Sequence, residues 1–150
     1  MIAVQPDPID AAAELARFVA GAADAGAVVS FTGVVRADND GEVLGLKLEH
    51  YAGFTEPAIA AIGASAVERF GVIDVTIVHR VGAMAPGDLI VFVAAAAVHR
   101  RAAFDAVDYC MDRLKTEAPL WKREEHPGGG RWIEPRPADR GDRQRWEHPA

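Results

Sequence analysis

Two lysines near the end of the chain have the type and spacing for acid–base chemistry. Lys115 and Lys122 lie seven residues apart in a 150-residue sequence that holds only 3 lysines but 13 arginines. Unlike a guanidinium, an ammonium group can lose its proton when it is buried. If the segment with Lys122 folds back beside Lys115, mutual repulsion and burial lower the pKa of at least one amine, which can then act as acid, base or nucleophile. The alternative for Lys115 is a structural cation favoured by a helix dipole.

A second group of cations opens the helix that we expect to end near Lys115. His99, Arg100 and Arg101 follow an apolar strand and occupy the first helical turn. Positive charge at that end of a helix costs a few tenths to about 1 kcal/mol per residue. A bound anion reverses the sign of this cost, because backbone amides, dipole and guanidinium then all face it. The residues leave two alternatives: an anion site, or arginines that extend into solvent or pair with Asp105.

The remaining reactive residues form weaker patterns. Cys110 falls on the apolar face of the same helix, which predicts a buried structural thiol rather than a nucleophile. The acidic segment 37–42 lacks the later glutamate of a calcium loop, and the glycines 128–130 do not open a helix. Four scattered histidines show no metal-ligand spacing: His50, His79, His126 and His148. We therefore expect neither a metal site nor a resident cofactor.

The elements that must position these residues can be placed from periodicity and turn signals. Helical spacing predicts helices over 10–22, with Asp10 as N-cap, over 55–70, with Thr55 as cap and Gly71 as stop, and over 100–117. Strands are predicted at 26–36 (buried), 43–51 (half-buried), 72–81 and 88–99, the last two separated by a Gly/Pro turn. A hairpin follows Pro119, with LWKRE and RWIE on either side of a glycine loop. This order predicts a compact α+β domain.

Length and composition limit the class of protein. One domain over residues 1–134 is expected, followed by a polar tail at 135–150 that is mobile or ordered only against a partner. Half of the residues are hydrophobic and no apolar run is long enough for a bilayer, so a disordered or membrane-spanning chain is excluded. The start resembles no signal peptide, and a single cysteine excludes a disulfide framework; both predict a cytoplasmic protein.

The charge distribution argues against nucleic acid as the partner. The net charge is −6; residues 1–98 carry 5 basic and 12 acidic side chains, whereas residues 99–150 carry 11 and 10. A general nucleic-acid binder usually presents a basic surface, which the acidic part of this chain does not supply. Positive charge gathered late in the sequence instead predicts a local anion site.

Several blocks of sequence, in one order, resemble the large, catalytic subunit of molybdopterin synthase. The similarity runs from about Gly26 to Trp146 and is carried by FTGVVR (31–36), LEHYAGFTE (48–56), VHRVGAMAPGDLIVFVAAAAVHRRAAFDA (78–106), MDRLKTEAPLWKRE (111–124) and GGGRWIE (128–134). The resemblance implies an α/β-hammerhead-like fold with an additional small antiparallel sheet. It also implies a central homodimer, extended to a heterotetramer by a small ubiquitin-like sulfur-carrier subunit on each protomer.

The same resemblance implies a sulfurtransferase reaction. The carrier's C-terminal Gly-Gly thiocarboxylate would deliver sulfur to cyclic pyranopterin monophosphate (precursor Z), and two rounds would build the molybdopterin dithiolene of the molybdenum cofactor. The family's essential lysines fall on Lys115 and Lys122. Residues that bind the substrate anion or complete the pocket fall on Arg36, His99, Arg100, Arg123 and Glu124. Val34 replaces a basic residue of some relatives, and Arg101 has no family role. The alternative function is a non-catalytic dimeric module that binds a phosphorylated metabolite or a carrier tail.

Overall fold

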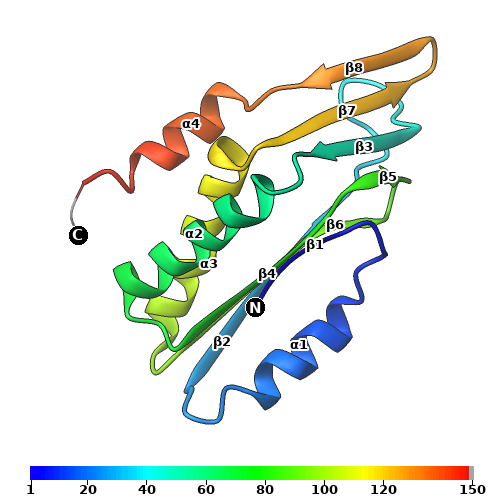
Figure 1. Ribbon diagram of the computed structural model, residues 1–150. Helices are drawn as coiled ribbons and strands as arrows, with labels where there is room; N and C mark the ends of the chain where they lie inside the picture. The colour runs from blue at the N-terminus through cyan, green and yellow to red at the C-terminus, as the bar shows by residue number, and fades with distance from the viewer. Residues whose placement is uncertain (149–150) are drawn as a thin grey trace.

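The fold consists of two four-stranded sheets and four helices, seen in Figure 1. The computed structural model describes residues 1–148. The first sheet has the order β1-β4-β6-β2, formed by Ile2–Gln5, Asp74–Arg80, Leu89–Ala97 and Ala27–Val34. Its strands pair antiparallel except for β1 and β4, which are parallel. The second sheet has the order β5-β3-β7-β8, formed by Gly82–Met84, Gly45–His50, Leu120–His126 and Gly129–Ile133, and it is antiparallel throughout.

Strand β6 explains how the helices are arranged around the first sheet. Successive side chains of a strand point to opposite faces. On β6, Val91, Val93 and Ala95 pack against α2 (Thr55–Phe70) and α3 (Arg100–Glu117), whereas Phe92 and Ala94 face α1 (Ala11–Ala20). Figure 1 shows α1 on one side of the sheet, with α2 and α3 together on the other. The uninterrupted apolar run therefore reflects a strand that is covered on both faces.

The helix boundaries agree closely with the sequence signals. Asp10 caps α1 by accepting a hydrogen bond from the Ala13 amide at 3.0 Å, and Gly71 ends α2 in the left-handed conformation (φ 62°). Thr55, predicted to cap α2, is instead its first residue. Its hydroxyl accepts from the Tyr51 amide and donates to the Pro119 carbonyl, both at 2.9 Å. The start of α2 is thereby tied to the entrance of β7.

The predicted hairpin is present as β7 and β8, which form one edge of the second sheet. The strand at the other edge of that sheet was not predicted from the sequence. Residues 82–84, expected to form only a turn, make the short strand β5 beside β3. Leu46 and Leu48 of β3 are buried with Met84, and Leu44 precedes the strand and is exposed. Strand β2, expected to be buried, is the edge of the first sheet, where Phe31 and Val34 are exposed.

The polar tail forms a helix that packs against its own chain, without a partner protein. Residues Pro137–Gln144 are α4, which packs against α3. Trp146 stands edge-on to the rings of Phe70 and Tyr109, with centroids 5.5 and 5.6 Å apart. Its indole N–H donates at 2.7 Å to Asp112, a buried carboxylate of α3. The expectation of a tail ordered only by another protein is therefore wrong for these residues, because α3 offers both apolar rings and a hydrogen-bond acceptor.

The fold class predicted from the sequence is confirmed: an α+β, hammerhead-like domain with an additional small antiparallel sheet. Within residues 1–148, no helix is long and apolar enough to cross a membrane. The second sheet and α4 meet at the carboxyl end of α3, as Figure 1 shows, and this junction positions the predicted lysines.

Candidate active site

Three elements bring two amines and a carboxylate together at the carboxyl end of α3. Lys115 lies in the last turn of α3, Lys122 on β7 and Asp139 in the first turn of α4. The ammonium of Lys115 lies 3.5 Å from Oδ1 of Asp139. Lys122 is close enough to both for each charge to affect its protonation. The fold therefore brings the two predicted lysines to one place and adds an acid that the sequence analysis left in the tail.

Lys122 is the perturbed member of the pair. Burial is the main cause of its lowered pKa, and the positive charge of Lys115 lowers the pKa further. The carboxylate of Asp139 acts in the opposite direction. Lys115, by contrast, keeps 40% of its side-chain surface exposed. This is the arrangement that the sequence predicted, with one amine that gives up its proton more readily than a solvated lysine.

A buried histidine lies behind Lys122. His79 of β4 is only 4% exposed, and its Nδ1–H donates to the Arg80 carbonyl at 2.9 Å. Burial lowers its pKa from 6.5 to about 4; the Arg80 hydrogen bond opposes this, and the charge of Lys122 adds to it. His79 is therefore neutral at pH 7, and it adds no third positive charge to the lysine pair.

A second network joins Arg36 to Glu124 through Asn39. The Arg36 guanidinium donates to Oδ1 of Asn39 at 2.7 Å, and Nδ2 of Asn39 donates to Glu124 at 2.8 Å. Burial would raise the pKa of Glu124, but hydrogen bonds from Asn39, His126 and Arg131 outweigh it, so that the pKa is lowered. The result is a carboxylate that stays ionised and a guanidinium that is held by its amide partner yet exposed to solvent.

The alternation of β7 decides which of its residues can share a pocket. Lys122 and Glu124 point to the same face, because they are two residues apart on a strand. Arg123 points to the other face, where it pairs with Glu125 at 2.8 Å and lies 5.6 Å from the Trp132 ring centroid. A Cβ at Gly130 would lie 2.6 Å from Nε of Arg123, so a larger residue there would require the Arg123 side chain to move. The structure thus brings Glu124, but not Arg123, to the side of Lys122.

His99 and Arg100 are far from this cluster within one chain. His99 is the N-cap residue of α3 and Arg100 is its first residue, and both are exposed. At 1.5 Å per residue, the fifteen residues from Arg100 to Lys115 span about 22 Å. The two predicted parts of the site therefore stand at opposite ends of one helix.

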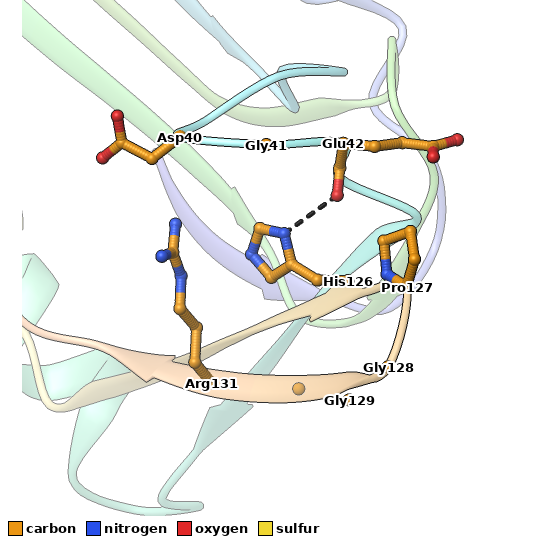
Figure 2. A pocket seen from close by; sticks show the side chains of 9 residues that line it. Asp40, Gly41, Glu42, His126, Pro127, Gly128, Gly129 and Arg131 are labelled. Atoms are coloured by element: carbon orange, nitrogen blue, oxygen red, sulfur yellow. Dashed lines mark hydrogen bonds between the residues drawn. The ribbon is translucent and has the colours of Figure 1, made fainter.

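Two shallow hollows flank these regions, and neither is lined by Lys115 or Lys122. One, of about 580 Å³, lies at the tip of the β7–β8 hairpin, and Figure 2 shows His126 inside it with Nδ1 on the Glu42 carbonyl at 2.8 Å. The other, of about 560 Å³, lies between β2 and the start of α3, where Arg101 and Phe104 line it. Phe104 is half exposed there.

The one cysteine of the chain lies where its helical spacing predicted, in the core. Cys110 is fully buried, and burial raises the pKa of its thiol to about 12, which makes it a structural residue. Residues 1–148 contain no group of three or more acidic, histidine or cysteine side chains that could hold a metal ion. Sequence reasoning missed Asn39 and Asp139, which it had placed in a turn and in a mobile tail. The one feature of the sequence that could have pointed to these two residues is that each is polar and lies within a few residues of a block that carries the family resemblance.

The fold and the lysine pair suit one class of protein, an enzyme that moves protons with a buried amine. Comparisons with known proteins make the class specific. The sequence model of the MoaE protein family matches residues 4–117. The molybdopterin synthase catalytic subunit of Caulobacter vibrioides is 50% identical over 150 residues, covering 100% of this chain and 99% of that protein.

Solved structures agree with the sequence comparison. The molybdopterin biosynthesis MoaE protein of Burkholderia ambifaria superposes with a TM-score of 0.84 at 44% identity, over 99% of this chain and 98% of that one. Molybdopterin synthase of Staphylococcus aureus gives a TM-score of 0.79 at 32% identity, over 87% and 94%. The chain belongs to the MoaE protein family.

Proposed function

We propose that this chain is the large, catalytic subunit of a molybdopterin synthase. In this role it transfers sulfur from the thiocarboxylated C-terminus of a small carrier subunit to cyclic pyranopterin monophosphate, in molybdenum cofactor biosynthesis. The observation that carries the proposal is the juxtaposition of Lys115 and Lys122, where the pKa of the buried amine is lowered by burial and by its neighbour. The relative from Caulobacter vibrioides, named for this catalytic subunit, supports it over the full length of the chain.

The sulfur has to come from outside this chain. The one cysteine, Cys110, is buried and its thiol is protonated at neutral pH, because burial raises its pKa to about 12. A carrier that ends in a thiocarboxylate supplies an anionic sulfur nucleophile instead. This chain then has to position that sulfur, stabilise developing negative charge and move protons.

The lysines have distinct tasks in this scheme. Lys115 acts at the carrier's acyl carbon or exchanges protons there, while Lys122 and Arg36 hold and polarise the pterin phosphate as its ring opens. The carrier's sulfur attacks a pterin side-chain carbon: the C–S bond forms as the bond from that carbon to an oxygen of the cyclic phosphate breaks, and the phosphate stays attached through its other ester oxygen. Water then cleaves the bond between the sulfur and the acyl carbon, which leaves the sulfur on the pterin and a carboxylate on the carrier. In a second round another carrier sulfur replaces the oxygen on the neighbouring carbon, which leaves as water, and the dithiolene is complete.

The separation along α3 supports a site that two copies of the chain complete together. His99 and Arg100 cannot approach Lys115 of their own chain across about 22 Å. In a homodimer, the exposed cations at the start of one α3 can reach the lysines of the other copy. The exposed apolar residues at the edge strand, Phe31 and Val34, are consistent with a surface that a protein covers. With one carrier per protomer, the assembly is a heterotetramer.

The cellular setting follows the chemistry. A pterin phosphate substrate and a carrier protein require neither a membrane nor nucleic acid, and we propose that the reaction takes place in the cytoplasm. An alternative assignment, a dimer that binds the phosphorylated metabolite or the carrier tail without turnover, shares the same surface. The two assignments differ in one respect: a module that only binds does not require an amine that is readily deprotonated.

The decisive experiment combines the purified chain with thiocarboxylated carrier and precursor Z, and measures molybdopterin by mass spectrometry. Turnover by the wild-type chain and its loss in Lys115→Ala, with carrier binding kept, are the expected results. A mixture that stays inert, although the same carrier is active with a known synthase, assigns the chain to the binding alternative. Affinity for RNA or DNA that falls steeply with added salt would instead indicate a nucleic-acid partner.

A further inference from the structure

The carboxylate of Asp139 occupies a place in the site that the motif residues do not explain. Asp139 belongs to α4, beyond the sequence blocks that carry the family resemblance, and it is only 8% exposed. Its Oδ2 accepts the Arg136 backbone N–H at 2.8 Å, while Oδ1 lies 3.5 Å from the Lys115 ammonium and 3.4 Å from the Arg136 guanidinium. One oxygen thus starts the helix, and the other faces the amine.

Helix α4 is held in place by contacts that are independent of Asp139. Arg145 donates at 2.7 Å to the buried Asp112, which also accepts the indole N–H of Trp146 at 2.7 Å. Arg143 donates to Glu117 at 2.5 Å. Because these anchors lie along the whole of α3's last two turns, the position of Asp139 is set by the fold rather than by its attraction to Lys115.

We propose that Asp139 is a positioning residue of the active site, which holds the Lys115 ammonium beside Lys122 and limits the net positive charge of the lysine pair. The proposal rests on the proposed function where it concerns turnover. Its electrostatic part concerns this chain alone, and it is tested without substrate.

The charges around the pair explain why one carboxylate matters. The groups that face the pair are Lys115 from α3, Lys122 from β7, Arg136 and Asp139 from α4, and His79 from β4, which is neutral at pH 7. Three positive charges therefore meet one negative charge in a partly buried place. Without Asp139, the repulsion between the positive charges would favour the loss of a proton from one of the amines. Asp139 consequently raises the pKa of Lys122 against the effects of burial and of Lys115.

The competing explanation is that Asp139 only starts α4. Burial would raise the pKa of Asp139, but its hydrogen bonds to Arg136 and the charge of Lys115 lower it, so that helix start and ion pair both favour the ionised form. The substitution Asp139→Asn separates the two roles. An amide oxygen still accepts the Arg136 N–H, but the negative charge is gone. Asp142→Asn is the matched control, because Asp142 is an exposed acid of the same helix.

The experiment measures the reactivity of individual lysines in the full-length chain. Acetic anhydride at limiting concentration labels neutral amines, and mass spectrometry reports Lys115 and Lys122 against the exposed Lys47 as internal standard. In Asp139→Asn, the labelling curve of Lys122 should move to lower pH, with up to about a fivefold faster labelling below its midpoint, the size expected for loss of a partly exposed ion pair. Asp142→Asn should label as the wild type.

A double-mutant cycle keeps the proposal falsifiable. If Asp139 acts on Lys122 partly through Lys115, Asp139→Asn should change the labelling of Lys122 less in a Lys115→Gln background. Labelling of Lys115 and Lys122 that is unchanged in folded Asp139→Asn overturns the proposal. Should Asp139→Asn unfold α4, Asp139→Ser, which also offers an oxygen to the Arg136 N–H, is measured by the same criterion.

Turnover gives a separate result. In the reconstituted assay, Asp139→Asn should shift the acidic limb of the pH–rate profile to lower pH and reduce kcat more than it changes KM. A shifted labelling curve in a chain that makes no molybdopterin refutes the proposed function but keeps the charge role of Asp139. A normal pH–rate profile in an active Asp139→Asn enzyme refutes the role in the active site.

Discussion

At its first turn α3 presents His99, Arg100 and Arg101 to solvent, whereas its last turn places Lys115 against a carboxylate and beneath another helix. Among residues 1–148, no ion pair involves Arg100 or Arg101. The helix dipole disfavours cations at the first end and favours them at the last. The first turn of α3, where the helix dipole disfavours positive charge, is thus the turn that contains no acidic residue.

This difference indicates how the two ends are used. Cations without internal partners, at a helix start, are suited to an anion that arrives from outside. Cations with a fixed counter-ion, partly buried and close to each other, are suited to proton exchange, because their protonation is set by the protein. We therefore propose that one end of α3 binds the substrate anion and that the other end carries the reaction. The predictions below test that division, in order of decreasing effect.

The largest effect is expected at the reacting end. Replacing Lys115 by alanine should lower kcat by about 10²- to 10⁴-fold, the usual contribution of a positioned acid or base. Carrier affinity, measured by titration calorimetry, should change little because the ammonium is only one of many contacts. Turnover at the wild-type rate would remove Lys115 from the chemistry.

Mixing variants sharpens the comparison by asking whether the two ends belong to one site across protomers. Lys115→Ala mixed with the double variant His99→Ala/Arg100→Ala should, after subunit exchange, recover about a quarter of wild-type activity, since half of the dimers then hold one intact site. Activity no higher than the mean of the two parent variants would show that each chain works alone.

A further prediction concerns His79, whose pKa is affected by Lys122. Its folded pKa of about 4 is below the unfolded value of 6.5, so the neutral form stabilises the fold fully above pH 6.5. This stability is lost as the pH falls from 6.5 through about 4, because the unfolded chain then binds a proton that the folded chain does not. At 1.36 kcal/mol per pKa unit, the loss amounts to about 3 kcal/mol. Urea titrations at several pH values measure it.

The substitution His79→Asn provides the comparison for that titration. Its amide can still donate to the Arg80 carbonyl, but it does not titrate. The part of the pH dependence between 6.5 and 4 that His79 causes should disappear in this variant. An identical slope in wild type and variant would assign the acid sensitivity to other groups.

Another prediction tests whether the stability of the α3 end that carries Lys115 depends on the packing of the tail against it. Trp146→Ala removes the edge-on contacts to Phe70 and Tyr109 and the indole donor to Asp112. The free energy of unfolding should fall by about 2 kcal/mol, because the ring is only partly buried. For a chain of this size the melting temperature should drop by about 4 to 8 °C.

Trp132→Ala is the control for that prediction, since Trp132 is half exposed on β8. It should shift the melting temperature by less than half as much. Equal losses would mean that the tail packs no more firmly than an exposed hairpin residue. Removing 135–150 altogether tests the predicted domain of 1–134, which should then fold with lower stability and with Asp112 left without its Arg145 and Trp146 partners.

The smallest effect is expected at the binding end. Arg100→Ala should raise KM for the pterin phosphate by about tenfold, or 1.4 kcal/mol, with kcat within about twofold. Arg101→Ala, which removes the neighbouring cation, should change KM by less than twofold. Equal effects of both substitutions would indicate a diffuse positive field rather than one contact.

The sequence predicted most reliably those elements whose signals are local. Helix α3 begins at Arg100 and ends at Glu117 as expected, because an apolar strand precedes it and Pro119 cannot continue it. The nearness of Lys115 and Lys122 was predicted only on the condition that the segment after Pro119 folds back beside the helix end, as β7 does. The buried Cys110 followed from helical spacing in the same way.

What the sequence could not supply depends on contacts between distant segments. Strands β1 and β5 are too short for a periodic signal and exist through their pairing with β4 and β3. Helix α4 contains Gly141 and several charged residues, which locally indicate a tail, and contacts with distant segments stabilise it, among them those to Asp112, to Glu117 and to the rings of α2 and α3. The opposite orientation of Arg123, by contrast, was readable from the two-residue period of a strand.

The late position of α4 has a consequence for synthesis of the protein. Asp139 leaves the ribosome well after Lys115 and Lys122. A polypeptide released early by a nonsense codon after residue 134 would therefore keep both amines but lack Asp139. On the role that we propose for Asp139, Lys122 of such a product would lose its proton at a lower pH than in the full chain.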